Sequence, residues 1–140
     1  MRNNGKDAEA GWLSIVDRAG GVVERFWDSA DLRGRNGGRA VGAYAQPSDF
    51  LLTLHGALEY AEVKSTNKKV SFPFSDIQPA QSSAALRQAL VGGPYNFYIY
   101  SYFLEKWFVL PCRQYKALVE AGCGSAKFED LDEWKLSSRI

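Results

Sequence analysis

The chain has 140 residues, 46% of them hydrophobic and 14% aromatic, which is enough to form one domain with its own core. This composition excludes a disordered chain, and no apolar run reaches the roughly 18 residues that a membrane span needs. The formal net charge of +1 excludes the strongly basic surface of a general nucleic-acid-binding protein.

The N-terminal residues and the cysteines indicate the cellular compartment. The N-terminal residues are polar and lack the apolar core of a signal peptide. Cys112 and Cys123 form neither a disulfide framework nor a zinc-ligand pattern. We therefore expect both cysteines to be reduced and structural, in a cytoplasmic protein.

The N-terminal half predicts a helix followed by strands. Apolar residues recur at helical spacing over 6–28, with a break or kink at Gly20-Gly21. Residues 29–38 predict a loop and 39–46 a strand. Residues 48–54 and 57–65 predict a hairpin around His55-Gly56. We expect Leu51, Leu54, Leu58 and Tyr60 to supply core side chains.

The C-terminal half predicts a second helix, a second hairpin and a third helix. Residues 67–76 predict a loop, and Ser75 or Asp76 is expected to cap a helix that runs to about residue 90 and ends at Gly92-Gly93. Strands are expected over 95–103 and 106–110, a helix over 112–121, and a short turn within 127–136. The resulting fold class is α/β, a single domain over 1–140 with a central mixed sheet flanked by helices.

Two carboxylates and a lysine fall together on the first hairpin. Asp49 stands where the first strand begins, and Glu62 and Lys64 share one face of the second strand because side chains alternate. Pairing of the two strands brings Asp49 close to Glu62. Carboxylates suit Mg²⁺, and a neighbouring lysine can position water and offset phosphate charge. This arrangement is the outline of a phosphodiesterase site.

Five segments in chain order carry a resemblance to a known family. They are Asn4-Gly5-Lys6-Asp7-Ala8-Glu9; Asp49; Ala61-Glu62-Val63-Lys64-Ser65-Thr66; Ser71-Phe72-Pro73-Phe74 with Gln81; and Gly92-Gly93 with the two strands before Pro111. Together they resemble the PD-(D/E)xK nuclease superfamily, and within it the RecU-type Holliday junction resolvases, over residues 4–118. The chain departs from the family pattern at three places. Ser48 precedes Asp49 where the family name indicates aspartate, and Gln78-Pro79-Ala80 stands where RecU-type proteins tend to have histidine. The stretch over 29–40 is short compared with the long stalk of those proteins.

The resemblance implies a restriction-endonuclease-like core and a DNA endonuclease that resolves four-way junctions by paired nicks, leaving 5′-phosphates. It implies Mg²⁺, with Mn²⁺ as a substitute, held by Asp49, Glu62 and the Val63 carbonyl. Glu9 completes or tunes that site, Lys64 positions and deprotonates water, and Gln81 lies near the scissile phosphate. A C2 homodimer is expected, because two symmetric nicks need two sites.

Basic residues gather in two acid-free stretches, over 32–48 and 65–75. Arg33, Arg35 and Arg39 in the first, and Lys68 and Lys69 in the second, are therefore the predicted DNA contacts.

Other interpretations remain open. The chain could be a sequence- or lesion-specific nuclease of the same fold, or a catalytically inactive DNA-binding accessory protein. His55, the single histidine, falls at a hairpin tip away from any nucleophile. The aromatic run over 95–107 could stack unpaired bases, although core or dimer packing fits a strand better.

Overall fold

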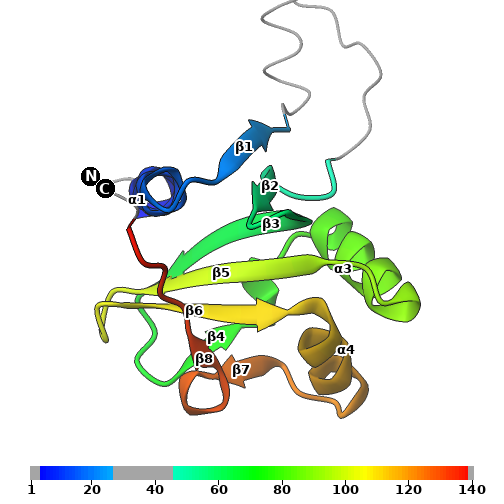
Figure 1. The fold of residues 1–140 in the computed structure, drawn as a ribbon. Helices are drawn as coiled ribbons and strands as arrows, with labels where there is room; N and C mark the ends of the chain where they lie inside the picture. Colours follow the sequence, from blue (N-terminus) through cyan, green and yellow to red (C-terminus); the bar gives the residue numbers. More distant parts are fainter. Residues whose placement is uncertain (1–3, 27–45, 139–140) are drawn as a thin grey trace, which may run out of the picture.

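The computed structural model describes residues 4–26 and 46–138, and its centre is a mixed sheet with helices on both faces (Figure 1). Six strands lie in the order β1-β2-β3-β5-β6-β8, and β4 and β7 form a separate two-stranded sheet. The strands are β1 Val22–Arg25, β2 Phe50–Leu54, β3 Ala57–Thr66, β4 Ser71–Pro73, β5 Tyr95–Ser101, β6 Lys106–Pro111, β7 Ser125–Lys127 and β8 Asp132–Glu133. The helices are α1 Asn4–Arg18, α3 Pro79–Val91 and α4 Cys112–Glu120, with 3₁₀ turns η1 Phe74–Asp76 and η2 Phe128–Asp130. The predicted fold class, a mixed sheet flanked by helices, is confirmed.

The first helix ends earlier than the sequence predicts. Helix was expected from residue 6 to 28, whereas α1 stops at Arg18 and residues 22–25 form β1. Gly20 has a φ of 86°, a left-handed conformation that glycine adopts freely and that commonly ends helices. The β-branched pair Val22-Val23 then favours an extended strand, which pairs antiparallel with β2. The predicted loop over 29–38 and almost all of the predicted strand over 39–46 lie outside the described residues.

The hairpin of β2 and β3 forms where the sequence predicts it. Leu54 pairs with Ala57 across a two-residue turn, and the two turn residues, His55 and Gly56, have φ of 52° and 77°. Positive φ at both central residues is what a type I′ turn requires, and this turn matches the twist of the strands. The exposed His55 lies at the tip, as predicted.

The most deeply buried side chains of this hairpin are not the predicted ones. Phe50, Leu52 and Ala61 are buried against α1, whereas Leu58 is 53% exposed. The expected core set (Leu51, Leu54, Leu58 and Tyr60) contains no buried residue, although Leu54 and Tyr60 pack at the edges of the core. Trp12 of α1 contributes to this difference, because its fully buried ring stacks on Phe50 at 5.2 Å and covers the face of β2 that carries Phe50, Leu52 and Leu54.

The strands β3 and β5 run parallel, and their register decides which face carries the polar side chains. Glu62 pairs with Phe97 and Lys64 with Ile99, so each pair points to the same side of the sheet. Phe97 and Ile99 belong to the core that α3 and α4 cover (Figure 1). Val63 belongs to the other core, under α1. Glu62 and Lys64 therefore lie on the α3 side of the sheet.

The second helix begins later than predicted. Pro79 occupies its first turn, and Gln78 is the N-cap without a side-chain capping bond. The predicted caps are wrong, because Asp76 ends η1 and Ser75 lies inside it. Proline is well suited to the first helical position, since its fixed φ is helical and it has no N–H to satisfy. Gly92, with a φ of 73°, ends the helix as predicted.

Two segments expected to be irregular contain strands instead. The predicted loop over 67–76 contains β4, and the predicted turn over 127–136 contains β8. The β4 strand pairs with β7, and β8 pairs with β6. The strands β5 and β6 and the helix α4 lie where they were expected. Cys112 and Cys123 are both free thiols, and Cys112 is buried.

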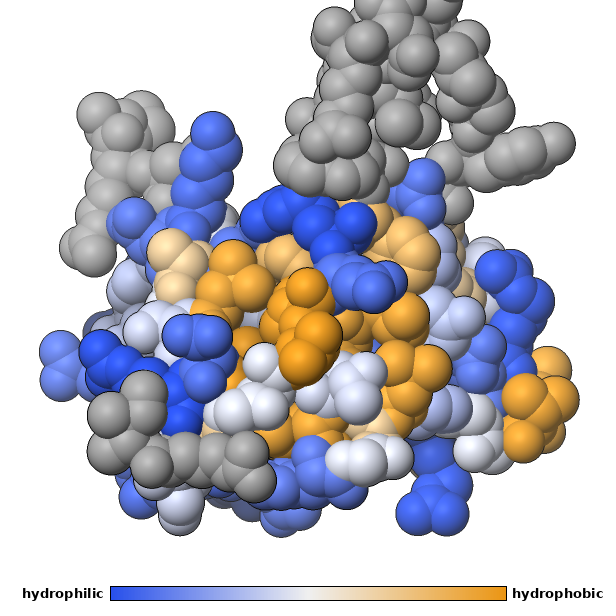
Figure 2. All heavy atoms as spheres, turned by 45° about the horizontal axis from the view of Figure 1, so that its top comes forward, coloured by the Kyte–Doolittle hydropathy of each residue, from blue (hydrophilic) through white to orange (hydrophobic). Residues whose placement is uncertain are grey.

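Several large apolar side chains remain exposed. Those more than half exposed are Val22, Leu58, Val70, Leu90, Val91 and Phe103. On the face that Figure 2 turns forward, hydrophobic residues gather near the middle with hydrophilic residues around them. Within the described part of the chain, no helix has the length and apolar character needed to cross a bilayer.

Candidate functional site

Two carboxylates are locked together where β2 begins. The backbone N–H of Asp49 donates to Oε1 of Glu62 at 3.0 Å, and the backbone N–H of Val63 donates to Oδ2 of Asp49 at 3.0 Å. Each acidic residue thus receives a hydrogen bond from the other's strand. We call these two residues the carboxylate pair. The predicted approach of Asp49 to Glu62 is what the structure shows.

The segment before β2 is fixed on three sides. The buried hydroxyl of Ser48 donates to the carbonyl of Phe50 at 2.9 Å, and the hydroxyl of Tyr95 donates to the carbonyl of Pro47. The N–H of Phe26, directly after β1, donates to the carbonyl of Asp49 at 3.0 Å. Asp49 is therefore held by β1, β3 and β5 at once, so its carboxylate has a defined position.

Burial makes the carboxylate pair reluctant to ionise. Glu62 is only 3% exposed, and burial, followed by the charge of Asp49, raises the pKa of its carboxyl group to about 8. The pKa of Asp49 is also raised, first by burial and then by the charge of Glu9. Lys64 opposes both shifts, with its Nζ 3.2 Å from Oε2 of Glu62. Lys64 is thus a cation that favours the ionised form of both acids.

Glu9 reaches the same region from α1 but is held by an arginine. Its Oε1 lies 3.1 Å from a guanidinium nitrogen of Arg25, the last residue of β1. The same guanidinium lies 4.8 Å from the centre of the Phe50 ring. The charges of Glu9 and Arg25 act on Asp49 in opposite directions, raising and lowering its pKa. Glu9 is therefore close enough to influence Asp49 electrostatically, and its charge is balanced by Arg25.

The donor atoms present suit a hard divalent cation. Within residues 4–26 and 46–138, no group of three or more His, Cys, Asp or Glu side chains is arranged to hold a metal. Mg²⁺ nevertheless needs only one or two protein carboxylates, because it keeps several waters and takes oxygens from substrate phosphates. Asp49 and Glu62 supply those carboxylates. In an extended strand the N–H and C=O of one residue point to the same edge, so the Val63 carbonyl faces the edge where its N–H meets Asp49.

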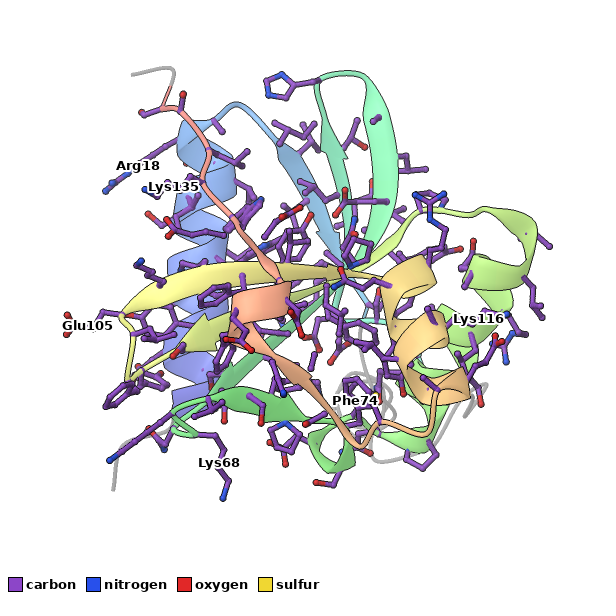
Figure 3. All side chains as sticks on the ribbon, turned by 90° about the horizontal axis from the view of Figure 1, so that it is seen from below. Arg18, Lys68, Phe74, Glu105, Lys116 and Lys135 are labelled. Atoms are coloured by element: carbon purple, nitrogen blue, oxygen red, sulfur yellow. The ribbon has the colours of Figure 1, made fainter. Side chains whose placement is uncertain are left out.

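The other predicted residues that the structure describes lie on α3 and on the turn after β3. Gln81, in the first turns of α3, has a buried Oε1 without a hydrogen-bond partner among the described residues. It belongs to the helix that covers the face carrying Glu62 and Lys64. Lys68 and Lys69 are exposed on the turn after β3, and Figure 3 shows Lys68 extending away from the molecule. The predicted contacts at Arg33, Arg35 and Arg39 lie outside the described residues.

Two residues of the site were not found from the sequence. The helix predicted over 6–28 includes Arg25, so the sequence does not connect Arg25 to Asp49 or Glu9. Tyr95 is one of several aromatic residues in a predicted strand, and its hydroxyl donates to the carbonyl of Pro47. Its hydroxyl stays protonated because burial raises its pKa, as do the charges of Glu62 and Asp49. A signal for Arg25 existed in Val22-Val23, since consecutive β-branched residues after a glycine pair favour a strand.

Comparison with known proteins finds distant similarity among solved structures. No protein-family model and no curated protein matches the chain. Among solved structures, the chain is similar to Archaeoglobus fulgidus Hjc, a Holliday junction resolvase from an archaeal hyperthermophile. The two chains share 14% sequence identity, with a TM-score of 0.49 over 78% of each chain.

Proposed function

We propose that this protein is a divalent-cation-dependent DNA endonuclease of the PD-(D/E)xK type. The observation that carries the proposal is the carboxylate pair, a buried Glu62 and a partly buried Asp49 whose carboxylates accept hydrogen bonds from the backbone N–H groups of Asp49 and Val63, with Lys64 beside Glu62. Mg²⁺ is the expected cation, and Mn²⁺ is a suitable substitute because it also prefers oxygen ligands.

The energetic cost of the carboxylate pair supports a functional reading over a structural one. Two acids that burial discourages from ionising destabilise the folded chain at neutral pH. Apolar residues of similar size in these strands would avoid that cost. Strongly perturbed carboxylates that share one location are typical of functional sites. A bound divalent cation would neutralise both charges and so remove the penalty.

The residues of the chain divide the chemistry between them. Asp49, Glu62 and the Val63 carbonyl would hold the cation, which when bound polarises a phosphoryl oxygen and lowers the pKa of water. Lys64 would position the attacking water and, as a cation, help to lower its pKa, so that the proton passes to solvent. Glu9 and Arg25 adjust the charge around Asp49, and Gln81 is the proposed amide contact to the scissile phosphate. In-line attack would leave a 5′-phosphate and a 3′-hydroxyl.

The proposed substrate is branched DNA, in particular four-way junctions. Lys68 and Lys69 are the described cations proposed to contact phosphates, and such contacts position a protein without reading sequence. Resolution requires one nick in each of two strands related by two-fold symmetry. A chain with a single carboxylate pair would therefore act as a homodimer.

The deciding experiment is cleavage of a labelled four-way junction beside a linear duplex of equal length, with Mg²⁺ or with EDTA. Wild type should nick the junction at symmetric positions only when Mg²⁺ is present. Asp49→Asn and Glu62→Gln should each lower the cleavage rate by at least about a hundredfold while junction binding is retained. Asp132→Asn, which neutralises an exposed acid of β8, is the matched control and should cleave as wild type does.

Other results of the cleavage experiment would each support a different conclusion. Equal cutting of junction and duplex would keep the nuclease and remove junction specificity, which favours a sequence- or lesion-specific enzyme. Binding without cleavage in wild type, under Mg²⁺ and Mn²⁺ alike, would leave an accessory DNA-binding protein. Full cleavage by Asp49→Asn would show that the carboxylate pair is not the active site.

A further inference from the structure

A cavity lies between the first turns of α1 and the turn that joins β5 to β6. Its volume is about 400 Å³. The residues that line it are Asp7, Ala8, Gly11, Tyr100, Tyr102, Glu105 and Trp107. Nothing in the proposed nuclease chemistry uses this cavity, and the inference drawn from it does not rest on that proposal.

Three half-exposed aromatic rings form its walls. Tyr100 and Trp107 are register partners on β5 and β6, so they share one face, and their ring centroids lie 5.2 Å apart. The ring of Tyr102 meets Tyr100 edge-on, at 4.9 Å and 85°. The rings therefore stand at angles to one another around a space instead of stacking flat. The sequence favoured core packing for this aromatic run: Tyr95, Phe97 and Tyr98 are buried, Tyr100 and Trp107 pack at the edge of the core under α1, and Tyr102 belongs to neither core cluster.

Acidic residues stand at the rim. Asp7 lies in the first turn of α1 and Glu105 in the β5–β6 turn, and both are exposed. Glu105 has a φ of 54°, a left-handed conformation that is uncommon for a residue other than glycine. Figure 3 shows its side chain extending outward from the turn. We call Tyr100, Tyr102, Trp107, Asp7 and Glu105 the aromatic cage.

The chemistry of the aromatic cage selects a cation. The faces of tyrosine and tryptophan rings carry negative potential, and carboxylates at the rim add to it. An unpaired nucleobase could also stack on these rings, but it would bring its phosphates towards two carboxylates. The adjacent turn residue Phe103 already receives a cation, since Nζ of Lys69 lies 5.3 Å from its ring centre. We propose that the aromatic cage binds a guanidinium or alkylammonium group, presented by an arginine or lysine side chain of a partner protein.

Gly11 provides a test that leaves the aromatic residues in place. It lines the cavity, and a Cβ built on it meets only Cζ2 of Trp107, at 3.8 Å, an ordinary contact. Gly11→Ala should therefore leave the cavity open, whereas Gly11→Leu should fill part of it. Both substitutions favour the helix, so both variants should fold. Glu105→Gln is a second variant that removes one rim charge at an exposed position.

The probes are Nα-acetyl-arginine amide, its neutral isostere Nα-acetyl-citrulline amide, and the peptide Gly-Arg-Gly, titrated while NMR shifts of Trp107 and Tyr102 are followed. The arginine probes should bind with a dissociation constant on the order of 1 mM, and citrulline at least about tenfold more weakly. Gly11→Leu should weaken arginine binding about tenfold or more, Glu105→Gln severalfold, and Gly11→Ala less than about twofold.

Three results would overturn the proposal. The first is citrulline binding as well as arginine, and the second is Gly11→Leu binding arginine like wild type. The third is deoxyadenosine shifting the same resonances while arginine does not, which would make the cavity a base pocket. Binding of the peptide at least as tight as that of the free amide supports a partner side chain. Binding of the free amide alone would overturn that part and leave a small organic cation as the ligand.

Discussion

Glu62 is the residue at which the destabilising effect of the buried carboxylate on the folded protein can be measured most directly. Its folded-state pKa of about 8 lies above its ordinary value of 4.5, because burial and Asp49 both disfavour the charged form. A carboxyl group with a raised folded pKa stabilises the fold fully below pH 4.5, and that contribution disappears as the pH rises through 8. The metal-free protein should therefore lose thermal stability between about pH 5 and about pH 9.

Thermal unfolding in EDTA across this pH range measures the loss, with circular dichroism as the readout. Glu62→Gln cannot ionise at this position, so its melting temperature should change much less over the same interval. Asp132→Asn should retain the wild-type slope. Addition of Mg²⁺ at pH 8 should raise the wild-type melting temperature and leave that of Glu62→Gln nearly unchanged, because binding to the folded state stabilises it. Identical pH slopes for wild type and Glu62→Gln would assign the effect to other groups.

At the scale of single elements, the β2–β3 turn offers the cleanest change. His55 occupies the first positive-φ position, at 52°, which asparagine adopts more readily than histidine. His55→Asn should raise the free energy of unfolding by roughly 0.5 kcal/mol. Gly56→Ala should lower the free energy of unfolding by about 1 kcal/mol, because a residue with a Cβ is strained at a φ of 77°. No atom lies within 4 Å of the added Cβ, so the methyl group makes no contact that offsets this strain. Urea denaturation measures both.

Both turn variants should cleave DNA at the wild-type rate if the nuclease proposal holds. The turn stands at the opposite end of β2 from Asp49, and the predicted changes act on backbone conformation alone. A stability loss in His55→Asn would mean that the histidine side chain makes a contribution that its exposed position does not suggest.

The elements that could be predicted are those whose information is local. The β2–β3 hairpin, β5, β6 and α4 follow from turn residues and apolar patterns within a few positions. The strands β4 and β8 could not be predicted, since three or fewer residues become a strand only through distant partners in β7 and β6. The core residues of β2 were not predicted correctly for the same reason, because leucines stand on both faces of the strand and Trp12 of α1 covers the face that carries Phe50 and Leu52.

The same distinction divides the candidate site. Asp49, Glu62 and Lys64 belong to one hairpin, so alternation and register were enough to place them together. Arg25 and Tyr95 come from strands whose pairing with this hairpin depends on the whole fold. Sequence patterns therefore predicted the charges of the site but not the residues that hold and balance them.

At the scale of the whole molecule, the question is how one carboxylate pair would cut two strands. A net charge of +1 gives little self-repulsion between copies, and several large apolar side chains are exposed. We therefore expect light scattering to give twice the 15.6 kDa of one chain at micromolar concentration. On a supercoiled plasmid with an extruded cruciform, such a dimer should produce linear DNA directly, because both nicks occur within one binding event.

Mixed dimers of wild-type and Asp49→Asn chains test whether two active sites act together in one particle. Wild-type chains refolded with an excess of Asp49→Asn chains should pair mainly with an inactive partner. Such a particle cuts one strand, and a single nick releases the supercoiling that maintains the cruciform, so nicked circles should accumulate in place of linear DNA. Monomers acting independently would give the same product distribution at every mixing ratio, with only the rate reduced. A product ratio that does not change with the fraction of Asp49→Asn would therefore exclude the dimeric resolvase while leaving the nuclease itself intact.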